Sequence, residues 1–414
     1  MKRVGSMTSD DSLFEEAKSD KDTRKAVQNQ IADIKNFVKG INIDEFKNGE
    51  WFAKLLTFSL DKYVQKVNAD YFRGKYPNLP PDAIVQARIK LAAKYAGIEG
   101  SLTAAAYSTA VIATLGSAGG ASPVTGPAGL TAFGVDLVYA SQLQLRLAYD
   151  IAVLYGVPLD LDDPEDLWKL IRIAFAIQVG EDAGNAVLKG VPAVARPVVK
   201  AIFSGPRLVA AKSLPVIGKY LLQRNIIKIS IPVVSIPLST GVNYWMTKVT
   251  ANKAREIMRK EAKMIESAKR MVNASEYCLD ELLWAAWMII AANGAQPDEA
   301  EYTLFHYLTL ISSESGVSAK TLDEIRNTVE VDYSKIWSML SQISDAAPIY
   351  RACTVMAAVD GKITSQEIDV LRRLADCCGE AFDEQELHEK GNSGVDDSFA
   401  VKDEVATYAI EIGD

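Results

Sequence analysis

The sequence predicts an all-α protein, and three observations lead to this prediction. Apolar side chains recur at spacings of three and four residues in several long segments, as they do on the buried face of an amphipathic helix. Runs of alternating polar and apolar residues, which are typical of strands, are nearly absent. The chain has 414 residues, of which 49% are hydrophobic and 24% charged. That composition is typical of an ordinary globular protein with two or three domains.

The predicted helices follow one another along the chain, over 51–72, 82–96, 128–155, 165–180 and 254–272. Residues 101–135 carry no charge and are rich in glycine, and their apolar run is shorter than the roughly 20 residues that a membrane-spanning helix needs. We interpret this stretch as a buried helical hairpin, with shallow or re-entrant membrane insertion as the alternative. The best strand candidate, 226–236, contains Pro232, which demotes it to a broken or edge segment.

Charge divides the chain into regions of different character. Residues 1–182 carry 20 basic and 23 acidic side chains, 183–255 carry 11 basic and no acidic ones, and 276–414 carry 9 basic and 27 acidic ones. The charge and the periodicity together predict three parts: an acidic helical extension over 1–44, a basic body over 45–272 and an acidic domain over 273–414. The first residues lack the apolar core of a signal peptide, so a cytoplasmic protein is expected.

The basic stretch has the composition of a segment that binds at a membrane surface. Leu, Ile, Val and Ala fill the gaps between its charges, and prolines divide it into short helices. Apolar area can enter the lipid boundary while each Lys or Arg near an anionic surface contributes about 1 kcal/mol. The candidate lipid-binding residues are Lys189, Arg196, Lys200, Arg207, Lys212, Lys219, Arg224 and Lys228.

Two other interpretations of the basic stretch remain. Its charges could pair with the acidic domain of the same chain, or they could bind nucleic acid. Nucleic acid is the partner expected least, because the stretch has few aromatic residues for base stacking.

Enzyme signatures are missing from the sequence. It contains no GxSxG, GxxxxGK[ST], GxGxxG or HExxH motif, and its four cysteines and two histidines do not have zinc-ligand spacing. We therefore expect a non-enzymatic role, with a hydrolase or transferase of unfamiliar type as the alternative. The pocket for that alternative would include Asp136, Arg146 and Asp150, and the i,i+4 spacing of Arg146 and Asp150 predicts a buried ion pair. Cys377 and Cys378 are predicted to be buried helix residues and not a redox pair, because adjacent cysteines bridge only with strain.

The acidic domain contains an internal repeat of helix, glycine turn and helix. The first copy passes through Asn293-Gly294 and the second through Asp360-Gly361. In the second copy Thr364 and Glu367 have the spacing of a capping box, as Asp298 and Glu301 do in the first. Gly361 suits the left-handed conformation that ends a helix.

These turn residues have three interpretations. They could be helix caps only, or Asp360, Glu367, Asp298 and Glu301 could form a divalent-cation site where the two turns meet, or they could belong to an acidic docking surface for a protein partner. An EF-hand is excluded, because the first and third loop positions would be Met356 and Ala358, which cannot supply ligands.

The segment Ala357-Ala358-Val359-Asp360-Gly361-Lys362-Ile363, with Glu367 behind it, resembles the TerB-like family. The resemblance covers about 276–380. It implies an all-helical, acidic, pseudo-symmetric domain linked to tellurite resistance and chemical stress, with metal binding through acidic residues. Asp360 and Glu367 match the family pattern, whereas Asn293 stands where an Asp is usual. No cofactor is certain, and a divalent cation is the candidate that the resemblance implies.

The preceding part resembles the EcsC family. The resemblance rests on Trp51-Phe52 with Leu55-Leu56, on Tyr71-Phe72-Arg73, and on Gln144-Leu145-Arg146-Leu147 with Asp150-Ile151-Ala152. It covers about 45–265 and implies a helical body with a role at the cytoplasmic face of the membrane. Together the two resemblances imply a peripheral membrane component of a stress or defence system, with an anionic membrane surface as its partner.

Overall fold

The computed structural model describes residues 19–104, 127–175, 236–292, 299–327 and 331–393, and the short pieces 214–215, 217–219 and 221–222. Of the described residues 82% are helical and none lies in a strand, so the all-α prediction is confirmed for this part of the chain. The chain divides into two compact units, Met1–Met258 and Arg259–Asp414. The division falls within one helix, α12 (Ile236–Ala274).

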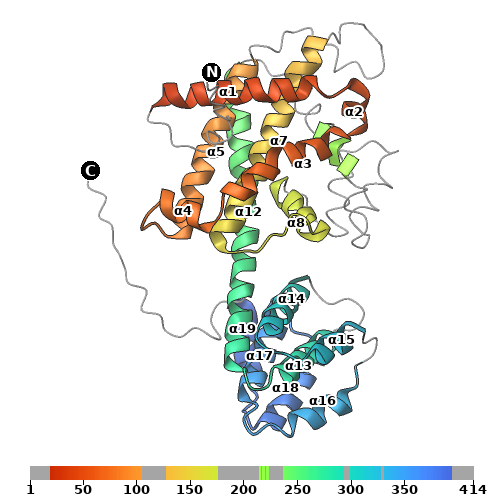
Figure 1. The fold of residues 1–414 in the computed structure, drawn as a ribbon. Coiled ribbons are helices and arrows are strands. Elements are labelled where there is room, and N and C mark those ends of the chain that lie inside the picture. The colour runs from red at the N-terminus through yellow and green to blue at the C-terminus, as the bar shows by residue number, and fades with distance from the viewer. Residues whose placement is uncertain are drawn as a thin grey trace, which may run out of the picture. The chain divides into compact units, whose positions relative to one another are not determined.

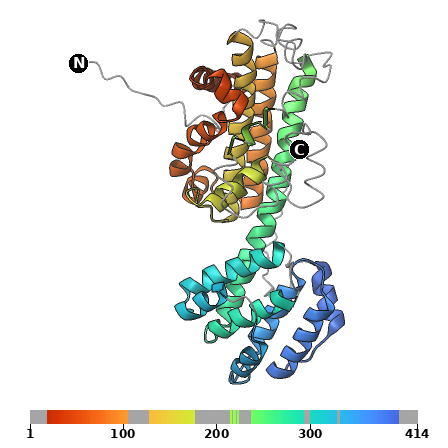
Figure 2. The same cartoon turned by 90° about the vertical axis from the view of Figure 1, so that its right-hand side faces the viewer.

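The first unit is a bundle of helices around α7. The helices that the structure describes in this unit are α1 (Asp20–Lys39), α2 (Ile43–Asn48), α3 (Trp51–Lys66), α4 (Ala69–Lys75), α5 (Pro81–Ala104), α7 (Pro127–Tyr155), α8 (Pro164–Ala174) and the first part of α12. Helix α7 packs against α1, α3, α4, α5 and α8. Its side chains are buried on nearly every face from Val135 to Ala152, as expected of a helix at the centre of a bundle. Figures 1 and 2 show α5, α7 and α12 running alongside one another in this unit.

Several predicted helix boundaries differ from the structure. The segment predicted as one helix over 51–72 is two helices, because Val67 is extended and Asn68 caps α4 by accepting a hydrogen bond from the Tyr71 amide at 2.9 Å. The helix predicted to begin at 254 begins at Ile236. Residues 105–126, 176–180 and 226–235 lie outside the described part, and with them most of the expected hairpin and of the strand candidate.

A close backbone contact holds Pro215 and Gly218 beside the turn between α2 and α3. Gly49 ends α2 with a φ of 80°, a left-handed conformation that favours glycine. A Cβ built on Gly49 would lie 1.8 Å from the Pro215 carbonyl oxygen, and one built on Gly218 would lie 2.2 Å from the Gly49 carbonyl oxygen. Only glycine at both positions allows this approach.

The second unit is built around the pair α13 and α17. It contains the rest of α12 and α13 (Leu279–Ala292), α14 (Glu299–Glu314), α15 (Ala319–Asn327), α16 (Tyr333–Leu340), α17 (Ala347–Ala358), α18 (Ser365–Cys378) and α19 (Glu384–Ser393). Helices α13 and α17 pack on each other, and each also packs on both α14 and α18. Among these four helices, exchanging the two copies of the sequence repeat therefore reproduces the same contacts.

The turn of the second repeat copy has the predicted geometry. Gly361 has a φ of 79°. Thr364 accepts a hydrogen bond from the Glu367 amide while the Glu367 carboxylate accepts one from the Thr364 amide, which confirms the capping box. The corresponding turn of the first copy, 293–298, lies outside the described residues.

Candidate functional site

The part of the basic stretch that the structure describes exposes its lysines. Of the eight candidate lipid-binding residues, Lys219 is described, and it is exposed in the helical piece held against Gly49. Lys248 and Lys253 on α12 are exposed as well. The other seven candidates lie outside the described residues, namely Lys189, Arg196, Lys200, Arg207, Lys212, Arg224 and Lys228.

The exposed side of α12 carries large apolar side chains among these charges. Trp245 is 59% exposed, Val249 46% and Tyr244 40%. Lys248 lies three residues after Trp245, on the same side of the helix. We call Tyr244, Trp245, Lys248 and Val249 the aromatic–cationic face. This face was not predicted from the sequence, although the sequence shows that no Asp or Glu occurs from 183 to 255.

The opposite side of α12 is buried and helps to hold the helix in the first unit. Thr247, Thr250 and Ala251 are buried. Near the start of this part Asn243 donates from Nδ2 to Glu99 Oε2 of α5 at 3.4 Å and to Asp136 Oδ1 of α7 at 3.5 Å. One turn before the unit ends, Arg255 donates from Nη2 to Asp82 Oδ1 at 3.1 Å and from Nε to the Tyr155 hydroxyl at 3.3 Å.

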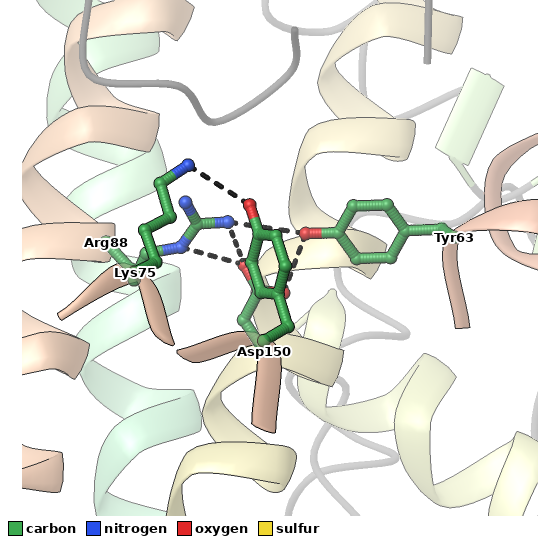
Figure 3. A network of polar contacts seen from close by, with 5 residues as sticks. Tyr63, Lys75, Arg88 and Asp150 are labelled. Atoms are coloured by element: carbon green, nitrogen blue, oxygen red, sulfur yellow. Dashed lines mark hydrogen bonds and ion pairs between the residues drawn. The ribbon is translucent and has the colours of Figure 1, made fainter. Parts of the chain in front are cut away.

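A buried ionic centre lies at the junction of α3, α5 and α7. The Asp150 carboxylate of α7 is 0% exposed and accepts hydrogen bonds at Oδ2 from Arg88 Nη2 at 2.6 Å and from Arg88 Nε at 3.1 Å. Its other oxygen, Oδ1, accepts a hydrogen bond from the Tyr63 hydroxyl at 2.7 Å. Figure 3 shows Arg88 and Tyr63 approaching Asp150 from opposite sides.

The ion-pair partner of Asp150 differs from the one predicted by spacing. The i,i+4 spacing predicted Arg146, but the structure pairs Asp150 with Arg88 of α5, which lies 62 residues earlier in the chain. Arg146 is buried as predicted, and it donates from Nε to the Ser59 carbonyl at 2.7 Å while its guanidinium lies 4.7 Å from the Tyr63 ring centroid. Helix packing across the bundle therefore decides the partner, because α5 and α3 face this side of α7.

Burial sets the electrostatics of this centre. It raises the pKa of Asp150, while the charge of Arg88 and the hydrogen bonds from Tyr63 and Arg88 oppose the rise. It also raises the pKa of the Tyr63 hydroxyl, and the negative charge of Asp150 adds to that rise. Buried charges are tolerated only when they are paired and hydrogen-bonded, so the arrangement serves to join three helices.

The three residues proposed for a pocket do not come together. Asp136 is half-buried beside Asn243, Asp150 lies in the ionic centre, and Arg146 lies against the Tyr63 ring. Asp136 and Asp150 are 14 positions apart on one helix, which separates them by about 20 Å. Arg88 and Tyr63 were not predicted from the sequence as members of this site, because neither has a carboxylate at helical spacing and both reach Asp150 from other helices.

In the acidic unit, two of the described candidate residues, Asp360 and Glu367, accept hydrogen bonds within the turn that precedes α18. Glu367 is buried and its Oε2 accepts hydrogen bonds from the Thr364 amide at 2.7 Å and the Thr364 hydroxyl at 2.9 Å. Asp360 accepts one from the Lys362 amide at 2.7 Å. Glu301 is buried on α14, and Asp298 lies outside the described residues. Within the described ranges no group of three or more His, Cys, Asp or Glu side chains is placed to hold a metal ion.

The two adjacent cysteines are not both buried, contrary to the prediction. Cys377 is exposed and Cys378 is half-buried at the end of α18. The buried face of this helix runs through Leu371, Leu374 and Ala375, so Cys378 continues that face while Cys377 lies beside it. Burial, with smaller contributions from Cys377 and Glu380, raises the pKa of the Cys378 thiol to about 11.

No helix in the described part of the chain combines the length and the apolar content that crossing a bilayer requires. No model of a known protein family, no curated protein and no solved structure matches the chain.

Proposed function

We propose that the chain is a non-enzymatic protein that binds the surface of an anionic membrane through its first unit. The observation that carries this proposal is the stretch 183–255, which has 11 basic and no acidic residues and whose three described lysines, Lys219, Lys248 and Lys253, are all exposed. Such a surface attracts anionic headgroups, and each cation near them contributes about 1 kcal/mol. Its location would be the inner face of the cell membrane.

The resemblances support a stress-related role for this protein. The first unit would be EcsC-like and the second TerB-like, in a stress or defence system of the kind linked to tellurite resistance. The acidic second unit would act as a sensor or docking domain for a protein partner, or would bind a divalent cation. Residues 276–414 include 27 acidic and 9 basic residues, so this part of the chain is complementary in charge to a basic partner. The basic stretch of the same chain is one candidate.

Vesicle co-sedimentation of the full chain tests the proposal. We expect the chain to sediment with vesicles of equal parts phosphatidylcholine and phosphatidylglycerol, and to stay in solution with phosphatidylcholine alone. Binding should weaken as salt is added, because salt screens exposed charges beyond about 8 Å at physiological ionic strength.

A charge-reversed variant and a matched control make the test specific. The variant replaces Lys189, Arg196, Lys200 and Arg207 by Glu, and it should lose most of the binding. The control replaces four exposed lysines outside the basic stretch, Lys62, Lys90, Lys320 and Lys335, by Glu, and it changes the net charge equally. Equally weak binding by both variants would mean that net charge alone, and not the basic stretch, determines binding. If the unchanged chain does not bind, the proposal is refuted.

A further inference from the structure

The aromatic–cationic face of α12 has the side chains that a helix needs at a membrane interface. Tryptophan is usually well buried in folded proteins, yet Trp245 is 59% exposed, and the other five tryptophans are buried or half-buried. Trp and Tyr favour the headgroup level of a bilayer, because their rings are apolar and carry one polar group. Val249 adds apolar area one turn after Trp245, and Lys248 lies on the same face of the helix.

The charge around this face limits the kind of partner that it fits. From 183 to 255 the chain has no carboxylate, and Lys248 forms no ion pair with any residue that the structure describes. The first carboxylate on α12 is Glu256, which pairs with Lys253 at 3.0 Å. An apolar surface with unneutralised positive charge is complementary to anionic lipid, in which acyl chains lie below negative headgroups.

The packing of α12 on the first unit also favours insertion at a membrane surface. The side of the helix opposite Trp245 is held by Thr247, Thr250 and Ala251 in the interior and by the contacts of Asn243 with α5 and α7. The helix therefore presents Trp245 outward from a fixed base, and binding does not have to order it first. Preformed surfaces lose less entropy on binding than segments that fold on contact.

We infer that the aromatic–cationic face of α12 inserts shallowly into an anionic bilayer, with Trp245 as its anchor and Lys248 at the phosphate level. The helix lies in the plane of the interface, where amphipathic helices bury their apolar face about 5–10 Å deep. This inference rests on the proposed function and adds the element and the residues that enter the lipid.

Two variants of the full chain measure the contribution of the face to binding. Trp245→Ser removes the anchor, and it should weaken binding to vesicles of equal parts phosphatidylcholine and phosphatidylglycerol about tenfold. Lys248→Glu reverses one charge and should weaken it about tenfold or more. The matched controls are Tyr302→Ser, which removes a 46% exposed aromatic side chain from α14, and Lys62→Glu, which reverses an exposed lysine of α3. Both controls should bind like the unchanged chain.

Fluorescence locates Trp245 directly and does not depend on the stability of the serine variant. Lipids that carry bromine on their acyl chains quench a tryptophan that enters the bilayer. The unchanged chain should be quenched on vesicles made with such lipids, and Trp245→Phe should bind with similar affinity but lose most of the quenching. Circular dichroism of each variant checks that the fold is retained.

The outcomes separate this inference from the proposed function. If reversal of Lys189, Arg196, Lys200 and Arg207 abolishes binding while Trp245→Ser and Lys248→Glu bind normally, the membrane proposal stands and the insertion of α12 is wrong. If the unchanged chain does not bind anionic vesicles, both are wrong. If Trp245→Ser weakens binding but bromine does not quench Trp245, or if the variant turns a dimer into a monomer in sedimentation analysis, the face contacts protein and the inference is overturned.

Discussion

The hydroxyl of Tyr63 and the guanidinium of Arg88 allow one carboxylate, Asp150, to lie in the interior of the first unit. All three side chains are buried, and they come from α3, α5 and α7. A buried hydrogen-bond acceptor that loses its donor costs about 1–3 kcal/mol. We therefore expect Tyr63→Phe to lower the free energy of unfolding by about that amount at neutral pH.

The same substitution should change how stability depends on alkaline pH. Burial raises the pKa of Tyr63, so the folded state keeps a proton that the unfolded chain loses near its ordinary pKa of about 10. The stabilisation is complete below that pH and is lost as pH rises through the folded pKa. Phenylalanine has no such proton. Above about pH 10 the free energy of unfolding of Tyr63→Phe should therefore fall less steeply than that of the unchanged chain, and the two slopes should differ by up to about 1.4 kcal/mol per pH unit.

Urea unfolding of both chains at pH values from neutral to alkaline measures this difference. The control is Tyr71→Phe, because the Tyr71 hydroxyl lies outside the ionic centre, where it accepts a hydrogen bond from Lys75 at 3.1 Å. Parallel curves for Tyr63→Phe and the unchanged chain would show that Tyr63 does not hold its proton in the folded state.

At the level of helices and turns, Gly49 provides a test of the contact that holds the piece with Pro215 and Gly218. Gly49→Ala puts a Cβ at a φ of 80° and 1.8 Å from the Pro215 carbonyl oxygen. Gly156→Ala is the matched control, because Gly156 has a φ of 68° and nothing within 4 Å of its would-be Cβ. Each substitution should cost about 1–2 kcal/mol for the left-handed backbone alone.

Gly49→Ala should cost more than Gly156→Ala, because the backbone contact with Pro215 must also open. Urea unfolding gives the two costs. Proteolysis near residue 215 should become faster in Gly49→Ala only. Equal costs and equal cleavage would mean that the piece is not held at this turn.

Substitutions of Glu367 can test whether this residue acts only as a cap at the start of α18. Its carboxylate accepts hydrogen bonds from the amide and the hydroxyl of Thr364. Because Gln can also close a capping box, Glu367→Gln should keep most of the stability of the second unit, whereas Glu367→Ala should lose about 1 kcal/mol.

A metal ligand would respond differently from a cap. Calorimetry of the full chain with calcium, magnesium, manganese and zinc should show no heat that depends on Glu367. If the unchanged chain binds one of these ions and Glu367→Gln does not, Glu367 is a ligand and the capping interpretation is incomplete.

At the scale of the whole molecule, each of the two units has its own interior. The first is centred on α7 and the second on α13 and α17. Units with separate cores can unfold in separate transitions. We therefore expect Tyr63→Phe to lower the midpoint of one thermal transition and Glu367→Ala to lower the midpoint of another.

Differential scanning calorimetry of the two variants and the unchanged chain measures these midpoints. Shifts that appear in different transitions would support independent units. A single transition that both substitutions shift equally would show that the two units unfold as one.

Features that depend on neighbouring residues could be predicted without coordinates. The helical class follows from spacings of three and four residues, and the capping box of Thr364 and Glu367 spans a single turn. The division of charge along the chain and the repeat in the acidic part were likewise visible without coordinates. These features could be predicted because both the pattern and the structure that it produces are local.

Which distant residues meet depends on how the helices pack, and sequence patterns did not predict it. The i,i+4 spacing predicted an ion pair between Asp150 and Arg146, but the packing of α5 on α7 pairs Asp150 with Arg88. The Gly49 contact with Pro215 and the exposure of Trp245 also depend on which helix surfaces face each other. The physical reason is that helical periodicity fixes which side of a helix is apolar, whereas the partner of that side is chosen by the packing of the whole bundle.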